Sequence, residues 1–429
     1  MSPLQEKQAR YARLIVRTAV NLQAGQPLFI WRAPVEASEF IRMLAEEAYG
    51  AGARQVEIFW EDDRIRLARF LHGQEAPAGC RPAWEAKVLA EGAAGGSAFL
   101  LFDCTCAGLL DPLRPDRLAR LVIEEGKRLD PLWQYLASND TNWTMVTVPT
   151  ESWARKLYAG LAVEEGIARI WEDIFTYCRL QGESAEEAWV EHIAALRARS
   201  DYLTLRGYRE LRFRGPGTDL SIGLPERHLW LGAGFVSRRG VPFIPNLPME
   251  EVFTLPHRGV AEGAVRGTLP LVVNGGIVEE FSLTFRQGRV VSFAAKRGQR
   301  LLEAVLATDE GASRLGEVAL VSQSSPIAES GRLFYNTLFD ENASCHLALG
   351  RSYRFSLREG SRFSAEEFAM AGGNLSLLHV DFMIGSSALE AEGIDSEGRS
   401  ETLLRGGEWA FTVDRAAQGR EDGGGKRIR

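Results

Sequence analysis

The stretch PLFIWRAPVEASEFIRMLAEEAYGAGARQVEIFW (residues 27–60) carries the pattern that decides the fold. It opens with the apolar run PLFIW (27–31) and closes with QVEIFW (55–60), two short runs rich in side chains that β-strands favour. Between them, residues 36–49 space their apolar side chains at helical intervals. A strand, a helix and a second strand in this order predict a βαβ unit with parallel strands.

The same alternation continues along the first half of the chain. The apolar runs SAFLLF (97–102) and TMVTVPT (144–150) indicate two more strands, and helical stretches at 64–71, 82–91 and 115–128 lie between the runs. We therefore expect an α/β domain with a mainly parallel sheet. No G-x-G-x-x-G follows these strands and no G-x-x-x-x-G-K occurs, so this nucleotide-type fold predicts no nucleotide site.

The pattern changes near residue 200. Residues 151–200 are helical in character, and from about residue 203 short strands alternate with Gly and Pro turns. This alternation predicts an α+β domain rich in antiparallel strands. The last residues contain almost no apolar side chains and a GGG run, which is typical of a disordered tail. We divide the chain into an N-terminal α/β domain (1–200), a C-terminal domain (201–413) and a tail (414–429).

Composition and charge exclude several classes of protein. Hydrophobic residues make up 45% and charged residues 25% of the chain, which is typical of a globular protein. A formal net charge of -7 argues against a nucleic-acid surface, and no apolar stretch approaches the length of a membrane span. The 5 cysteines are odd in number and widely scattered, which argues against a disulfide framework and favours the cytoplasm.

Polar residues that could carry chemistry stand out inside apolar segments of the second domain. The clearest segment is SLLHVDFMIG (376–385), a predicted buried strand that contains His379 and Asp381. Residues two apart on a strand point to the same face, so these two side chains are neighbours. A buried carboxylate is costly unless it is paired or bound to a cation. Two interpretations remain open here: a structural His–Asp hydrogen bond, or two metal ligands.

Three more segments add acids and a histidine. Glu317 opens the apolar run of LGEVALV, although an acid at the start of a strand is usually solvated. Glu341 and His346 lie around a turn-like sequence in NTLFDENASCHLALG. Glu250 and Glu251 are adjacent before the extended VFTL, so their side chains face opposite ways and only one can face a site.

Together these residues favour a metal site over a nucleophile-based one. The chain has no H-E-x-x-H zinc helix and no G-x-S-x-G nucleophile elbow. Carboxylate-rich shells that contain histidine suit two divalent ions, whereas cysteine-rich shells suit structural zinc. Two such ions are a recurrent device for hydrolysis. From the residues alone we therefore infer a possible metallohydrolase, with its substrate undefined.

The same segments resemble one family closely, the thermophilic metallo-aminopeptidases typified by aminopeptidase T. The matching strings include PMEEVFTLP, DEGASRLGEVALV, FYNTLFDENASCH and HVDFMIGS, and the resemblance runs from the first helix to about Trp409. It implies a set of six metal ligands, with Glu317 bridging two ions. The implied ligands are Glu251, Glu317, Glu341, His346, His379 and Asp381. It also implies a catalytic tyrosine at Tyr353, which would donate a hydrogen bond to the developing oxyanion.

The resemblance further implies a broad-specificity aminopeptidase that binds two divalent ions per chain and acts on peptides with a free N-terminus. Zinc, cobalt, manganese and magnesium all suit such a shell. A homodimer is expected, without nucleic-acid or membrane partners. Glu250 is a candidate for the proton shuttle or the amine anchor, but the favoured interpretation is an exposed neighbour of a ligand. Two other functions remain open: a dinuclear amidase acting on a small acyl compound, and a non-catalytic metal- or peptide-binding relative.

Overall fold

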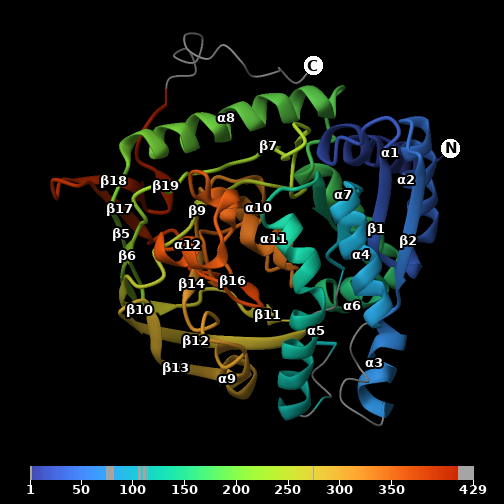
Figure 1. Cartoon of the computed structure of the whole chain (residues 1–429). Helices are drawn as coiled ribbons and strands as arrows, with labels where there is room; N and C mark the ends of the chain where they lie inside the picture. The colour runs from blue at the N-terminus through green and yellow to red at the C-terminus, as the bar shows by residue number, and fades with distance from the viewer. Residues whose placement is uncertain are drawn as a thin grey trace.

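The computed structural model describes residues 2–73, 82–104, 108–109, 113, 115–273 and 275–413. The residues up to 206 are called the N-terminal half and those from 207 the C-terminal half. Figure 1 shows parallel strands and helices of the N-terminal half at the right and the strand-rich C-terminal half at the left. The predicted mixture of a parallel α/β part and an antiparallel part is confirmed. The predicted disordered tail (414–429) lies outside the described residues.

The N-terminal half is built on a parallel sheet of four strands in the order β2-β1-β3-β4. Every residue of β3 is buried, because helices cover both faces of a parallel sheet and leave an apolar strand in the middle. The strands are β1 (Pro27–Pro34), β2 (Gln55–Glu61), β3 (Ala98–Phe102) and β4 (Trp143–Val146).

Helices link these strands and continue past the sheet. The first five are α1 (Pro3–Arg13), α2 (Ser38–Gly50), α3 (Asp63–His72), α4 (Ala83–Gly95) and α5 (Pro115–Leu136). The next three are α6 (Glu151–Leu157), α7 (Val163–Tyr177) and α8 (Ala185–Arg206). A π-helical segment (Leu14–Ala19) extends α1.

Helix α8 lies over the C-terminal half, as the top of Figure 1 shows. Its hydrogen-bonded cap is Ser184, and it ends at Gly207, whose positive φ of 60° closes the helix. The helix therefore runs through residue 200, and one cluster of buried side chains contains residues from both halves. The division into domains at residue 200 remains a prediction.

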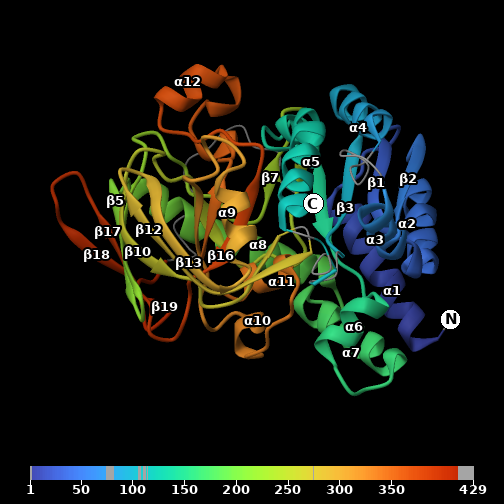
Figure 2. The same cartoon turned by 90° about the horizontal axis from the view of Figure 1, so that it is seen from below.

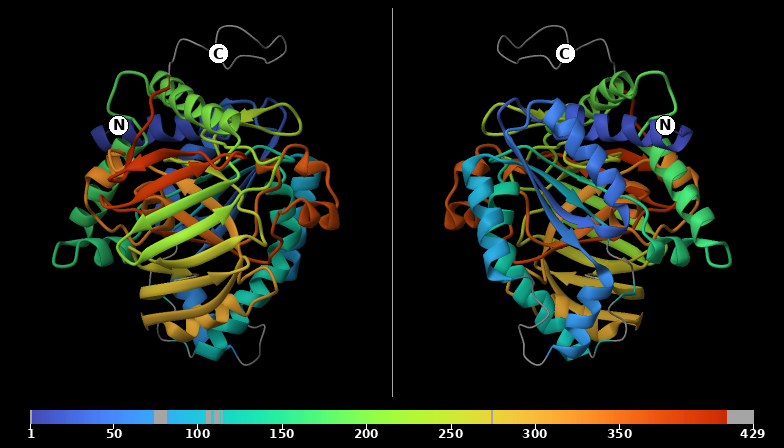
Figure 3. Two further views of the ribbon diagram at one scale, coloured as in Figure 1. Left: turned by 90° about the vertical axis from the view of Figure 1, so that its left-hand side faces the viewer. Right: turned by 90° about the vertical axis from the view of Figure 1, so that its right-hand side faces the viewer.

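The C-terminal half contains a large antiparallel sheet, which faces the viewer in the left panel of Figure 3. Its order is β11-β12-β10-β6-β5-β17-β18-β19, and β13 pairs with β12. Its first strands along the chain are β5 (Glu210–Gly215), β6 (Thr218–Gly223), β10 (Ala261–Arg266), β11 (Leu271–Val273) and β12 (Gly276–Arg286). The others are β13 (Arg289–Arg297), β17 (Glu390–Ile394), β18 (Ser400–Arg405) and β19 (Glu408–Trp409).

The C-terminal half also contains a smaller antiparallel sheet in the order β16-β15-β14-β9, whose strand β16 is labelled in Figure 2. All residues of β14 and β15 are buried, so any polar side chain on them is buried as well. Its strands are β9 (Val252–Thr254), β14 (Leu315–Leu320), β15 (His346–Gly350) and β16 (His379–Met383). The other elements of this half are β7 (Phe235–Val236), β8 (Pro242–Phe243), α9 (Gln299–Leu306), α10 (Pro326–Glu329), α11 (Thr337–Asn342) and α12 (Ala365–Met370).

The two halves are joined by backbone hydrogen bonds as well as by side-chain packing. The amide of Met145 on β4 donates to the carbonyl of Pro245 at 2.6 Å, and the amide of Leu247 donates to the carbonyl of Met145 at 3.0 Å. Residues 245–247 thereby extend the edge of the parallel sheet. The chain then passes directly into the small sheet at β9. None of the helices among the described residues is both long enough and apolar enough to cross a membrane.

Candidate metal centre

The small sheet places four of the candidate residues on one face. Glu317 on β14 pairs with Ala348 on β15, and Ala348 pairs in turn with Asp381 on β16. Paired residues project to the same side of a sheet, and so do residues two apart on one strand. His346 and His379 lie two positions from Ala348 and Asp381, so their side chains share this face.

Small residues occupy the positions between these polar side chains. Ala348 lies between Glu317 and Asp381, and Ala319 lies opposite His346. Gly350 lies opposite His379, and a Cβ added there would stand 2.3 Å from the carbonyl oxygen of Leu378. Larger side chains in this row would fill the space that the acids and histidines surround. The local sequence therefore builds a lined hollow rather than a packed apolar face.

Two more acids reach this hollow from outside the three strands. Glu251 directly precedes β9, and Glu341 lies on α11. Asn342 connects their segments, because its Oδ1 accepts a hydrogen bond from the Glu250 amide at 2.6 Å. Its Nδ2 lies 3.5 Å from Glu341 Oε1, and the Nδ2 of Asn246 donates to the same oxygen at 3.3 Å. Glu341 is thus held beside Glu251 by two amide side chains.

Two groups of three residues have the spacing of metal ligands. The buried trio consists of Glu251, Glu317 and His346, and the cavity-side trio of Glu317, His379 and Asp381. In each group the possible ligand atoms lie within 4.8 Å of one another, and Glu317 belongs to both. Among the described residues Glu341 belongs to neither trio, although it lines the same small cavity.

Both histidines present Nε2 to the carboxylates. The Nδ1 of His346 lies 3.0 Å from the carbonyl oxygen of Ser344, and the Nδ1 of His379 lies 2.7 Å from that of Arg351. A carbonyl can only accept, so Nδ1 carries the proton in each ring. The Nε2 of His346 is 3.0 Å from Glu251 Oε2, and the Nε2 of His379 is 3.3 Å from Asp381 Oδ1. Carbonyl-bound rings oriented in this way are typical of metal-ligating histidines.

The carboxylates of the site strongly shift the pKa values of one another and of the neighbouring histidines. Burial, together with the nearby charges of Glu251 and Asp381, raises the pKa of Glu317 to about 7, although the two histidines act to lower it. Burial also raises the pKa of Glu341 well above its usual range, again with help from Asp381. Burial opposes protonation of His379, yet Asp381 and Glu317 raise its pKa to about 9. These shifts show that the hollow stabilises positive charge.

The residues fit a site for divalent metal. Glu251 Oε2 is buried and accepts no hydrogen bond from a described residue, because the nearby Nε2 of His346 carries no proton when Nδ1 donates to Ser344; this is costly for a carboxylate oxygen. A cation between the carboxylates and the two Nε2 atoms would satisfy it and would replace the protons that the crowded acids otherwise take up. Four carboxylates and two imidazoles are a donor set that zinc, cobalt, manganese and magnesium all accept.

Tyr353 lies at the edge of the same site. Its ring stacks on Phe355 with centroids 5.0 Å apart and lies 4.8 Å from the ring of His379. Burial raises its pKa well above the usual range, and the charges of Glu317 and Asp381 raise it further. The hydroxyl therefore stays protonated at neutral pH and is available as a hydrogen-bond donor.

Two cavities meet at the site. A cavity of about 40 Å³ contacts all six candidate ligands, which is room for only a few water-sized groups. A larger cavity of about 320 Å³ lies between the two halves and contacts Glu341, Tyr353, His379 and Asp381. Its N-terminal wall contains aromatic side chains, including Trp31, Trp133 and Trp143. Of the two trios, only the cavity-side trio borders this larger space.

The expectation for Glu250 is wrong in one respect. Glu250 and Glu251 do face different ways, as adjacent extended residues must, but Glu250 is buried rather than exposed. It accepts a hydrogen bond from Arg179 Nη2 at 2.6 Å, and His192 Nε2 lies 3.7 Å from its other oxygen. Residues at and before α8 therefore cover the outer face of this segment. Glu250 is not among the described residues that line the two cavities. We therefore assign it a structural role instead of the role of proton shuttle.

The residues that support the site were not expected from the sequence. They include Arg351, Asn342 and Asn246, each of which makes a contact that joins segments distant in the chain. Only their polar character inside apolar surroundings is visible in the sequence. Such a signal marks many buried hydrogen-bonding residues equally well.

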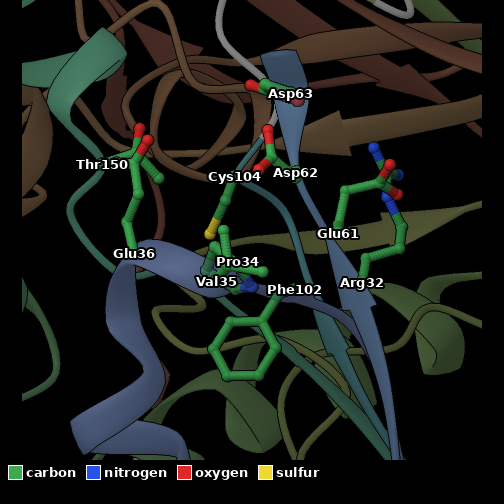
Figure 4. Close-up of a pocket in the computed structure, with 10 residues that line it drawn as sticks. All are labelled: Arg32, Pro34, Val35, Glu36, Glu61, Asp62, Asp63, Phe102, Cys104 and Thr150. Atoms are coloured by element: carbon green, nitrogen blue, oxygen red, sulfur yellow. The ribbon is translucent and has the colours of Figure 1, made fainter. Parts of the chain in front are cut away.

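A second, smaller pocket lies where nucleotide-type folds bind ligands. The strand order reverses between β1 and β3, and Figure 4 shows the pocket at the carboxyl ends of these strands. As the described residues outline it, the pocket measures about 20 Å³. Glu36, Asp62 and Asp63 are among its lining residues. Its small size and acidic lining are unsuited to a phosphate group.

Comparisons with known proteins agree over nearly the whole chain. A family model described as thermophilic metalloprotease (M29) matches residues 4–409. Aminopeptidase 2 of Geobacillus stearothermophilus is 40% identical over 413 residues, covering 96% of this chain and 100% of that protein. Aminopeptidase T of Thermus thermophilus is 40% identical over 409 residues, covering 95% and 100%. The solved structure of wild-type AmpT from Thermus thermophilus matches with a TM-score of 0.85 and 38% identity, covering 95% of this chain and 100% of that one.

Proposed function

Because the chain belongs to the thermophilic metalloprotease (M29) family and is a metal-dependent aminopeptidase, we propose that it uses two divalent ions to remove N-terminal residues from varied peptides. The observation that carries this proposal is the position of Glu317, which belongs to both ligand trios. A carboxylate with two oxygens suits the role of a bridge between two ions. We assign the ions to Glu251, Glu317, Glu341, His346, His379 and Asp381.

The ions, when bound, supply Lewis acidity toward the peptide carbonyl and lower the pKa of bound water to about 7. The side chains of the site do the rest. His379 and Asp381 border the larger cavity, so the scissile bond of a peptide in that cavity lies beside the cavity-side trio. The small cavity behind them is too narrow for a peptide, which keeps the substrate on one side of the ligands.

Tyr353 is the proposed hydrogen-bond donor to the substrate. It lines both cavities, and its raised pKa keeps the proton on the phenol oxygen. A donor placed where negative charge develops on the carbonyl oxygen stabilises the transition state more than the ground state. The stacked ring of Phe355 and the neighbouring ring of His379 restrict the movement of this tyrosine. We therefore assign Tyr353 to oxyanion stabilisation.

The varied lining of the larger cavity supports a broad specificity. Its walls combine apolar residues such as Leu129 and Val272 with the charged residues Arg66, Glu125 and Arg351. A space of about 320 Å³ with such mixed walls selects no single type of side chain by charge or shape.

The test compares matched substrates on metal-loaded and chelated enzyme. We expect release of free leucine from Leu-Gly and Leu-Ala, none from their N-acetylated forms, and loss of both activities after chelation. Cleavage of the N-acetylated dipeptides at an equal rate would favour a dinuclear amidase instead. Metal binding without turnover of any peptide would favour a non-catalytic relative.

Cytoplasmic location and assembly as a homodimer are further parts of the proposal. Cys104, Cys178 and Cys345 are all free thiols in the structure, which supports a reducing compartment. The dimer is carried over from the family resemblance. Light scattering on the purified protein should give about twice the mass of the 47.5 kDa chain, and a mass of one chain would contradict it.

A further inference from the structure

Arg351 makes buried contacts with both halves of the molecule. It directly follows β15, and its side chain is 11% exposed. Its Nη2 donates to Asp130 Oδ1 on α5 at 2.7 Å, and its Nε donates to the carbonyl oxygen of Ser376 at 2.9 Å. Its own carbonyl oxygen accepts from His379 Nδ1 at 2.7 Å, and its amide donates to the carbonyl of Leu378.

These contacts hold residues 376–379, the segment that leads into β16, from three sides. The side chain of Arg351 is hydrogen-bonded to this segment at Ser376, and its backbone is hydrogen-bonded to it at residues 378 and 379. Helix α5 packs against the same segment, because a Cβ added to Gly126 would stand 3.1 Å from the carbonyl oxygen of Leu377. Gly126 and Asp130 are four residues apart and therefore share one face of α5.

The other histidine of the site lacks this support. The carbonyl that orients His346 belongs to Ser344, two residues away in the same strand connection. The carbonyl that orients His379 belongs to a residue held by a helix of the N-terminal half, with 221 positions between Arg351 and Asp130. Only one of the two imidazoles is therefore oriented through a contact between the halves.

We propose that Arg351 is a positioning residue that orients the His379 imidazole for the cavity-side metal and makes that metal position depend on Asp130 of α5. The inference rests on the proposed two-metal function. The carbonyl partner of a ligating histidine fixes the tautomer and the ring orientation, and loss of such a partner weakens metal binding by roughly 10–100-fold. A shift of the Arg351 backbone would also move Tyr353, which follows two residues later.

The test measures the affinity of both metal positions in variants on each side of the contact. Arg351→Met removes the charge and both side-chain hydrogen bonds but keeps most of the apolar stem. Asp130→Asn keeps the shape and one acceptor oxygen but removes the charge, at a site in the other half of the molecule. Stepwise cobalt titration, followed by visible absorption and by competition with a chelator, gives the two dissociation constants without using activity.

We expect Arg351→Met to raise the dissociation constant of the weaker cobalt ion by about 10–100-fold and to change its absorption bands, while the tighter ion binds as in the wild type. Asp130→Asn should have the same effect at a smaller magnitude. Arg351→Lys, which keeps the charge facing Asp130, should restore part of the affinity. Should Arg351→Met fail to fold, Asp130→Asn and Arg351→Lys carry the test.

Asp173→Asn is the matched control. Asp173 on α7 pairs with Arg332 of the C-terminal half, so it is also an Arg–Asp contact between the halves, but it touches no candidate ligand. It should leave both cobalt constants unchanged. Equal weakening by Asp173→Asn, or wild-type affinity in Arg351→Met, would overturn the inference. Loss of both ions in Glu317→Ala, alongside wild-type affinity in Arg351→Met, would overturn this inference alone and leave the proposed function standing.

Discussion

The two ligand trios share Glu317 but differ in their surroundings. In the buried trio the side chains of Glu251 and His346 are 5% and 1% exposed, whereas in the cavity-side trio those of His379 and Asp381 are 18% and 13% exposed. As the described residues outline the two cavities, both trios border the small cavity, and residues of the cavity-side trio also border the space between the halves. One position is thus enclosed by protein, and the other faces the cavity that we propose binds the peptide.

This difference in exposure suggests that the buried trio retains its metal ion and the cavity-side trio contacts the substrate. A cation enclosed by buried carboxylates loses little to competing water, so the buried trio should hold its ion more tightly. The cavity-side trio has open space beside His379 and Asp381, where a substrate carbonyl can approach. The two trios should therefore behave differently when ligands, ions or supporting residues are removed.

The largest effect is expected where the trios meet. Glu317→Ala removes the shared carboxylate and should abolish both metal binding and activity, because each trio loses one of its three ligands. The fold should remain, since the substitution also removes a buried acid from a crowded group. Metal content by mass spectrometry and circular dichroism check the two parts. Full activity of this variant in metal-stripped buffer would contradict the two-metal proposal.

Graded removal of metal should separate the trios. A mild chelator should extract the more exposed cavity-side ion first, so that activity is almost lost when about half of the metal remains bound. The metal-to-protein ratio and the rate of leucine release are measured on the same samples over time. A proportional decline of metal and activity, with both ions leaving together, would show that the two positions are equivalent.

Tyr353→Phe should leave both trios occupied and still slow the reaction. Loss of one oxyanion donor lowers kcat by roughly 10²–10³-fold in other hydrolases, and we expect a similar decrease here. The phenyl ring preserves the stacking on Phe355, so metal content and KM should change little. Steady-state kinetics with a leucyl chromogenic amide, together with a metal count, measure both. Wild-type kcat and KM would remove Tyr353 from the mechanism.

Local periodicity explains what was predictable from the sequence. The common face of His379 and Asp381 follows from the two-residue repeat of a strand, and their Nε2–Oδ1 distance of 3.3 Å agrees with it. The parallel strands of the N-terminal half follow from alternating periods in the same way. The pairing of Glu317 with Asp381 through Ala348 depends on strand order, which periodicity does not contain.

Contacts between distant segments were the part that the sequence did not reveal. Glu250 was expected to be an exposed neighbour of a ligand. Arg179 and His192, which lie 71 and 57 positions from their partners in this segment, bury it instead. The family resemblance, rather than any pattern in the chain, brought the six candidate ligands together as one set.

The smallest effect on activity is expected at Glu250, which adjoins Glu251 of the buried trio and points to the opposite side, toward Arg179. Glu250→Gln keeps the shape and the acceptor oxygen but removes the charge that faces Arg179. A buried pair that loses one partner is destabilised, so the free energy of unfolding should fall by about 1–3 kcal/mol. Catalysis should change less than about tenfold, because Glu250 faces away from both trios.

Two measurements on this variant decide between its structural and catalytic roles. Thermal unfolding of the metal-loaded protein should show the loss of stability, and Arg179→Met should lower it by a comparable amount because it removes the other partner. A proton shuttle would behave in the opposite way, with kcat reduced at least about a hundredfold and stability retained. That result would place Glu250 in the reaction, and it would require the segment before β9 to turn so that Glu250 as well as Glu251 faces the site.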